Sequence, residues 1–211
     1  MIPYFERWMK RFPTPEKLAR APLQTVLREW SGLGYNRRGK FLHDAAKAVV
    51  GRGSFPQSYE ELRNLPGVGD YTAKAVRVFA LNKPEVLIET NVRAVFLYHF
   101  FTHSKSVSDT KLLPLIKQSM AKQNPRTWYA ALMDYGSFLK STHPNPSRRS
   151  KHHTKQSKFE GSLRQARGAI LKAISRGKNF KGLRNPYIQH FDKALASLVR
   201  DGLVTPTQLR E

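Results

Sequence analysis

The 211-residue chain contains no cysteine. It therefore forms no disulfide, no thiolate-ligated zinc site and no iron–sulfur cluster held by cysteines. It also lacks a run of about 18 apolar residues, the length that a membrane-spanning helix needs. Its opening residues 2–7 do not show the basic and then apolar order of a secretory signal peptide. These absences predict a cytoplasmic or nucleoid-associated protein with no membrane segment.

Acidic residues are scarce. Only 15 Asp and Glu stand against 37 Lys and Arg, which gives a formal net charge of +22. A surplus of this size suits a polyanionic partner, and nucleic acid is the first candidate. Association with ribosomes, or a surface that is merely basic and soluble, is the alternative.

β-strand patterns are missing as well. No stretch of useful length alternates apolar and polar residues, whereas apolar residues recur at helical spacing through most of the chain. Thr14 before Pro15 predicts a helix start, and Ser58 with Glu61 predicts a capping box. The fold class is therefore all-α, with helices expected at 38–50, 70–82, 90–101, 110–122 and 125–139, among others.

A glycine turn, Leu65-Pro66-Gly67-Val68-Gly69, joins the helix that follows Ser58 to the helix at 70–82. Both glycines can take positive φ and let another backbone come close. The amides around them lie at a helix N-terminus, where unpaired donors and the helix dipole favour a phosphate. We expect this turn, with Tyr71 and Thr72, to bind the DNA backbone irrespective of sequence. A purely structural turn between helices is the alternative.

Residues 140–158 contain no acid and form a polar, basic loop with two prolines. We expect Arg148, Arg149 and Lys151 to contact phosphates. Lys74, on the helix after the glycine turn, is expected to face a phosphate or solvent, and a role as a substitute nucleophile is the alternative. The histidines of the basic loop have no cysteine or acidic residue near them in the sequence. We therefore expect them to contact phosphate or solvent and to form no metal site.

The last residues, 159–211, regain helical periodicity at 163–174 and 188–199. The run 201–204, Asp-Gly-Leu-Val, follows the second of these helices. This order is typical of the second helix and first wing strand of a winged helix. A helical hairpin that packs on the main body is an equal alternative.

Three segments, in order and spacing, resemble the helix-hairpin-helix superfamily of base-excision DNA glycosylases, which includes endonuclease III and the A/G-specific adenine glycosylases. They are residues 2–50, with Gly-Leu-Gly-Tyr-Asn at 32–36 after a tryptophan, then LPGVGDYTAKAV at 65–76 and IETNVRAV at 88–95. The resemblance covers residues 2–139 and is closest to the adenine glycosylases.

The resemblance implies a partial six-helix barrel in residues 1–88, with the helix-hairpin-helix at 58–82. A second helical part at 89–139 carries the catalytic carboxylate. The basic loop at 140–158 and a small C-terminal helical or winged-helix unit at 159–211 follow. The implied function is monofunctional removal of a mispaired base, adenine opposite guanine or 8-oxoguanine, from mismatched or damaged double-stranded DNA.

The resemblance also assigns roles to single residues. Tyr71 stands where endonuclease III has its nucleophilic lysine, and tyrosine cannot form a Schiff base, which disfavours a lyase. Glu89 falls on the family's catalytic aspartate, and a carboxylate there would stabilise the cationic sugar of the transition state. A helix-capping carboxylate is the alternative for Glu89. Tyr35, Arg37 and Arg38 are expected to wedge into DNA or contact its backbone while a base is flipped; for Tyr35, a place in the core is the alternative.

Two departures from the family qualify this expectation. The cysteines that commonly hold an iron–sulfur cluster are replaced by the basic loop, so we expect no cofactor. In adenine glycosylases a helix with a glutamate general acid and a Gln-rich segment precede the stretch that matches residues 2–5. We therefore expect this chain to bind DNA and to excise adenine feebly or not at all. The competing functions are a catalytically silent DNA-binding protein and a thymine-mismatch or endonuclease III-like glycosylase.

Overall fold

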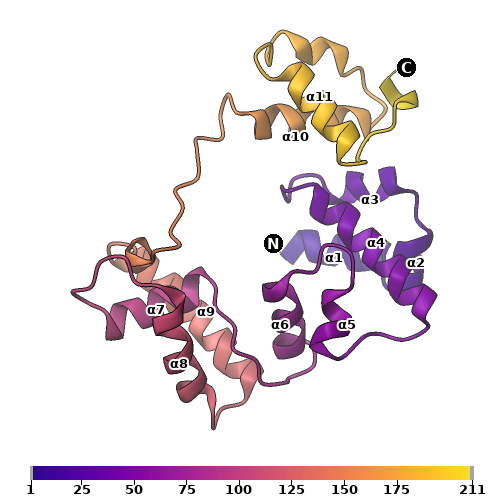
Figure 1. The fold of residues 1–211 in the computed structure, drawn as a ribbon. Coiled ribbons are helices and arrows are strands. Elements are labelled where there is room, and N and C mark those ends of the chain that lie inside the picture. Colours follow the sequence, from indigo (N-terminus) through magenta and orange to yellow (C-terminus); the bar gives the residue numbers. More distant parts are fainter. Residues whose placement is uncertain (1, 210–211) are drawn as a thin grey trace. The chain divides into compact units, whose positions relative to one another are not determined.

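A computed structural model describes residues 2–209. These residues form helices joined by turns, and their only β interaction is an isolated bridge between Val107 and Ser150. This confirms the predicted all-α class (Figure 1). No helix in residues 2–209 is both long and apolar enough to cross a membrane.

The chain divides into two compact units. Residues 1–55 and 157–211 form one, here the terminal unit, and residues 56–156 form the other, here the central unit. The first boundary therefore lies at 55/56, whereas the sequence had suggested 88/89. As a result, the glycine turn and Glu89 lie in the same unit.

The terminal unit contains eight helical elements among its described residues. They are α1 (Ile2–Arg11), α2 (Pro15–Arg20), α3 (Leu23–Trp30), α4 (Arg37–Arg52), α10 (Leu163–Ile174), η2 (Lys181–Arg184), α11 (Phe191–Arg200) and η3 (Thr207–Leu209). Helix α2 begins as predicted: the Thr14 side chain accepts a hydrogen bond from the amide of Lys17, and Pro15 takes the first helical position.

The C-terminal helices pack on α3. Leu27 of α3 shares a buried cluster with Ile170 of α10 and Leu198 of α11. Leu203 and Val204, which the winged-helix alternative placed in a wing strand, are buried in the same cluster and form no strand. The C-terminal residues are therefore helical and do not form a winged helix. The reason is that these two side chains fill the core beside α3 instead of pairing with a second strand.

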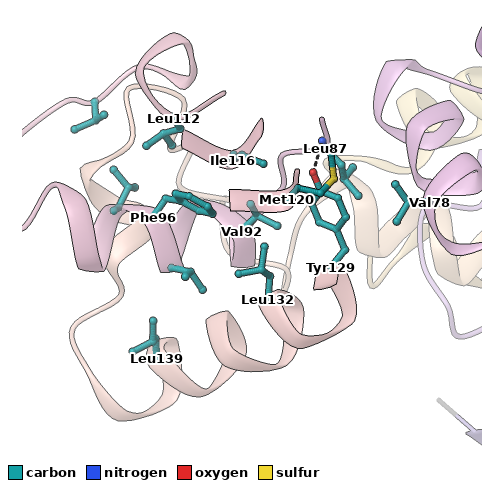
Figure 2. Packing of buried hydrophobic residues seen from close by; sticks show 13 residues of the cluster. Val78, Leu87, Val92, Phe96, Leu112, Ile116, Met120, Tyr129, Leu132 and Leu139 are labelled. Atoms are coloured by element: carbon teal, nitrogen blue, oxygen red, sulfur yellow. Dashed lines mark hydrogen bonds between the residues drawn. The ribbon is translucent and has the colours of Figure 1, made fainter. Parts of the chain in front are cut away.

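The central unit contains α5 (Tyr59–Arg63), α6 (Asp70–Phe79), α7 (Thr90–Phe100), α8 (Asp109–Met120), α9 (Pro125–Thr142) and η1 (Pro146–Arg149). Each expected helix is present here with ends shifted by three residues or fewer. Its core joins Val78 of α6, Phe96 of α7, Ile116 of α8 and Tyr129 of α9 (Figure 2).

Helix α9 holds the extended segment that leads into α7. The Tyr129 hydroxyl accepts a hydrogen bond from the Leu87 amide at 2.9 Å (Figure 2). The same hydroxyl donates to the Glu85 carbonyl, also at 2.9 Å. Further along α9, a Cβ on Gly136 would lie 2.3 Å from the carbonyl oxygen of Asn91. Only glycine permits this approach, so α9 sets the position of the first turn of α7.

The predicted loop at 140–158 is partly ordered structure. Helix α9 continues to Thr142, and η1 lies against α7. The buried hydroxyl of Ser147 donates to the Thr90 carbonyl at 2.8 Å. The amide of Val107 donates to the Arg149 carbonyl, also at 2.8 Å. The prediction of a loop was wrong for 140–142, 146–149 and the bridge residue Ser150, because contacts with distant parts of the chain leave no local sequence pattern.

Candidate nucleic-acid interface

The glycine turn at 65–69 links α5 to α6. The capping box that begins α5 is present, with both Ser58 and Glu61 bonded as predicted. Gly67 has a φ of +74°, in the left-handed region that favours glycine. Gly69 has a φ of −89° and is the extended N-cap of α6. The expectation of positive φ was therefore correct for Gly67 and wrong for Gly69, because the residue that begins a helix is extended.

The turn leaves backbone donors open. No side chain caps the start of α6, and the amides of the first turn of a helix have no carbonyl partner within it. Gly67, Gly69 and Thr72 are exposed. Leu65 and Val68 are half-buried, and the Val68 amide closes the turn with a 3.1 Å hydrogen bond to the Leu65 carbonyl. Such a site can bind an anion.

The first residues of α6 carry an arrangement that the sequence analysis missed. The Asp70 carboxylate accepts a 2.7 Å hydrogen bond from the Tyr59 hydroxyl and forms an ion pair with the Lys74 ammonium at 3.0 Å. The Lys74 ammonium also lies 5.9 Å from the centre of the Tyr59 ring. The Lys74 ammonium is thus paired with Asp70 as well as partly exposed, and the Asp-Lys spacing of four residues could have indicated the pair. A phosphate contact by Lys74 stays a prediction.

Glu89 is the N-cap of α7. Its Oε1 accepts hydrogen bonds from the amides of Asn91 at 2.6 Å and Val92 at 2.9 Å. Its Oε2 is 3.4 Å from the Asn91 side-chain nitrogen. The capping alternative is thus present in the structure. Capping also fixes the carboxylate and leaves Oε2 as its less engaged oxygen.

Tyr71 and Glu89 act on each other electrostatically. Tyr71 is 43% exposed. Burial, and then the negative charge of Glu89, raise the pKa of the Tyr71 hydroxyl above its usual value. The hydroxyl is therefore protonated at neutral pH. The two residues that the resemblance made catalytic are brought into one electrostatic neighbourhood of the central unit.

A second glycine turn lies in the terminal unit, between α3 and α4. Three of its residues have positive φ: Gly32 at +101°, Gly34 at +71° and Tyr35 at +48°. The Trp30 indole donates to the Gly34 carbonyl at 3.0 Å, and the Arg38 guanidinium lies over the rings of both Trp30 and Tyr35. Tyr35 is 66% exposed, so the alternative that places it in the core is wrong.

Arg37 and Arg38 differ in their surroundings. Arg38 braces the turn through its two aromatic contacts. Arg37 is exposed, with its guanidinium over the Phe41 ring and 3.8 Å from Asp201. Both can present positive charge to a polyanion, with the charge of Arg37 partly offset by Asp201.

The three cations expected to contact phosphates also differ. Arg148 and Lys151 are exposed. The Arg149 guanidinium instead donates to the carbonyls of Leu97, at 2.9 Å, and Thr102. These carbonyls lie at the C-terminal end of α7 and just beyond it, where a cation is favourable. These bonds use two of the guanidinium N–H donors and hold the side chain against the end of α7, which disfavours its predicted role as a free phosphate contact.

His143 is bonded through both ring nitrogens. Its Nε2 lies 3.2 Å from the Tyr98 hydroxyl and its Nδ1 lies 2.8 Å from Thr142 Oγ1. His143 is exposed, as expected for a solvated ring, and its two bonds also tie the end of α9 to α7; a phosphate contact stays a prediction.

Comparisons with known proteins agree on one family. Residues 1–118 match the model of the HhH-GPD superfamily of base excision DNA repair proteins, a range that includes the glycine turn and Glu89. An adenine DNA glycosylase of Mycobacterium tuberculosis is 30% identical over 95% of this chain and 75% of its own length. An adenine DNA glycosylase of Buchnera aphidicola is 32% identical over 66% of this chain and 40% of its own length.

The fold has a counterpart among solved structures. That of a thermostable thymine-DNA glycosylase superposes with a TM-score of 0.55 at 21% identity, covering 70% of this chain and 68% of the other. The chain spans less than half of the Buchnera relative, so it corresponds to part of that protein. With the family match over more than half of the chain, the helix-hairpin-helix geometry and the fold in agreement, the chain belongs to the HhH-GPD superfamily of base excision DNA repair proteins.

Proposed function

We propose that this chain is a monofunctional DNA N-glycosylase that removes adenine opposite guanine or 8-oxoguanine. The observation that carries the proposal is the pairing of an open glycine turn with a fixed carboxylate, Glu89, in one unit. The names of its relatives, adenine DNA glycosylases at about 30% identity, support the choice of base.

Binding begins at the backbone. The amides of the exposed residues Gly67 and Gly69 meet a phosphate of the duplex, and the net charge of +22 strengthens the attraction. Because phosphate contacts carry no sequence information, this turn positions the protein on any duplex. Recognition of the mispaired base then needs other groups.

Exposed Tyr35 suits the second task. Its backbone lies in the left-handed region, which costs a residue other than glycine about 1–3 kcal/mol and is found often at functional sites. The Arg38 guanidinium lies 5.3 Å from the centre of the Tyr35 ring, and a ring of this kind can enter a base step while a nucleotide is flipped out.

Glu89 supplies the charge for bond cleavage. Breaking an N-glycosidic bond builds positive charge on the sugar, and a fixed carboxylate stabilises that charge. The Asn91 and Val92 amides hold Glu89 in place, with Oε2 left to face the sugar or orient a water. Tyr71 has no amine for a Schiff base, and the Lys74 amine is paired with Asp70. The reaction therefore ends at an abasic site without strand cleavage.

The test is base release from duplexes that contain A:G, A:8-oxoG or T:G pairs, read as strand breaks with and without alkali. We expect breaks at adenine, only after alkali, and at the feeble rate that the sequence predicts for this chain. Glu89→Gln should slow release by about a hundredfold or more while binding persists. Glu85→Gln is the matched control, because it removes a nearby carboxylate that pairs with Arg77 instead. Release that is unchanged in Glu89→Gln contradicts the proposed role, and preferential release of thymine contradicts the proposed base.

A catalytically silent DNA-binding protein is the second candidate, and the capping bonds of Glu89 favour it. Two amides already occupy Oε1, so the residue has a structural role whether or not it has a chemical one. Duplex binding without release of any base, at protein in excess over DNA, identifies this second function.

A further inference from the structure

Asp70 poses an electrostatic problem for the glycine turn. It is the first residue of α6, next to the amides proposed to meet a phosphate, and its side chain is 59% exposed. A negative charge at this place repels the phosphate that the turn attracts. In a chain with only 15 acidic residues, an acid here needs an explanation.

Neighbouring side chains hold this carboxylate in one direction. The Tyr59 hydroxyl, from α5, donates to Oδ1 at 2.7 Å, and Lys74, one helical turn further on, lies 3.0 Å from Oδ1 and 3.1 Å from Oδ2. Both oxygens are thus bonded to side chains, and among residues 2–209 neither accepts from the amides that begin α6. The amides remain available to a ligand.

Protonation does not relieve the repulsion. The hydrogen bonds from Tyr59 and Lys74 hold the pKa of Asp70 below its usual value, so the carboxylate is charged at neutral pH. The same bond raises the pKa of the Tyr59 hydroxyl. The charge is therefore permanent under ordinary conditions, and its position decides how strongly it acts on a phosphate.

We propose that Asp70 is an internal counter-charge that weakens duplex binding at the glycine turn, and that Tyr59 is a positioning residue that keeps the Asp70 carboxylate away from the phosphate. The ligand is the DNA phosphodiester backbone, and the inference rests on the proposed DNA-binding function. Such a counter-charge limits the time that a chain of charge +22 spends on DNA without a lesion.

The first experiment measures the affinity of the 211-residue chain for a fluorescent, undamaged duplex at low salt. Asp70→Asn should raise affinity about threefold, the effect of one charge several ångströms from a phosphate in water. Asp192→Asn is the matched control: it removes the same charge from an exposed ion pair, 2.6 Å from Arg184, in the other unit. A gain for Asp70→Asn no larger than the gain for Asp192→Asn overturns the counter-charge.

The second experiment is a double-mutant cycle. Tyr59→Phe removes only a hydroxyl. It should lower affinity by about twofold in the natural chain, because an exposed carboxylate is weakly held, and should have no effect in Asp70→Asn. An equal loss in both backgrounds would mean that Tyr59 acts on DNA or on the fold directly, which overturns its positioning role. Spectroscopic titration adds an independent check: the pKa of Tyr59 should fall in Asp70→Asn.

Gly67→Val separates this inference from the proposed function. If Gly67→Val folds and binds like the natural chain, the turn does not bind DNA and the proposed binding mode fails with the counter-charge. If Gly67→Val loses binding but Asp70→Asn gains nothing over Asp192→Asn, only the counter-charge fails.

Discussion

The two glycine turns both depend on glycines with positive φ, but they expose different groups. At 65–69 a single positive φ, at Gly67, leaves backbone amides open and projects no large side chain. At 32–35 three positive φ values, interrupted only by Leu33, present the exposed ring of Tyr35. One turn exposes backbone, which suits a phosphate that is the same at every step, and the other exposes an aromatic side chain, which suits a base.

The largest expected effect is at Gly67. Replacement by valine forces a β-branched residue to a φ of +74°, which costs about 1–3 kcal/mol of folding stability, and should weaken binding to every duplex alike. Urea unfolding and duplex titration measure the two effects. Gly177→Val is the control, because Gly177 also has a positive φ, +63°, with open space around its Cβ position, and lies outside the glycine turn. An equal loss of duplex affinity in both variants would show that the loss comes from lower stability and not from the glycine turn.

The next effect sharpens the contrast at Tyr35. Tyr35→Ala should leave binding to a matched duplex nearly unchanged and lower the preference for a mismatched one by about 1–3 kcal/mol, the value of a base–aromatic stack. Tyr35→Phe should retain the preference. Competition titrations with matched and mismatched duplexes measure it, and equal losses on both duplexes would place Tyr35 on the backbone instead.

A smaller effect separates two adjacent arginines. Replacing Arg148 and Lys151 together by glutamine should lower affinity for all duplexes and reduce the slope of log affinity against log salt by about one for each phosphate that is no longer neutralised. Arg149→Gln should instead destabilise the central unit by about 1–3 kcal/mol, because the carbonyls of Leu97 and Thr102 lose their donor. If Arg149→Gln keeps full stability and loses affinity, its assignment as a brace for α7 is wrong.

The smallest effect compares the two units in acid. In the terminal unit, burial and then the charge of Lys47 lower the pKa of His43 from 6.5. Because the pKa of His43 is lower in the folded state than in the unfolded state, its neutral form contributes fully to stability above pH 6.5. This contribution is lost as the pH falls, since the unfolded state then binds a proton more readily. In the central unit, Arg93 lowers the pKa of Asp109, so its contribution disappears only at more acid pH.

Urea unfolding of the natural chain and of His43→Gln at several pH values tests this order. We expect the loss of stability between neutral pH and about pH 5 to shrink in His43→Gln and to be unchanged in Asp109→Asn. The opposite result would place the first acid-sensitive group in the central unit.

Much of the local structure could be predicted from the sequence. The caps at Thr14 and Ser58 and the turn at Gly67 depend on residues within a few positions of one another, and the structure has all three. The resemblance supplied Tyr71 and Glu89, and in the structure the charge of Glu89 is close enough to contribute to the raised pKa of Tyr71. Their catalytic roles, and the DNA contacts of Tyr35, Arg37 and Arg148, stay predictions.

Contacts between distant segments could not be predicted in this way. Nothing near Arg149 indicates that its guanidinium reaches carbonyls about fifty residues earlier in the chain, and nothing near Gly136 indicates the backbone of Asn91 beside it. Leu203 and Val204 form an apolar pair that suits a strand. They pack in the core beside α3 instead, and this depends on contacts with residues far away in the sequence.

By itself, the sequence determined the helical class, the caps, the glycine turn and the family, because each depends on residue type and short spacing. The tertiary structure alone decided which cations are open to a phosphate, that Glu89 caps α7, and that Tyr59 and Lys74 restrain Asp70. These three features depend on which donors and acceptors meet when the helices pack. The geometry of that packing cannot be predicted from any local sequence pattern.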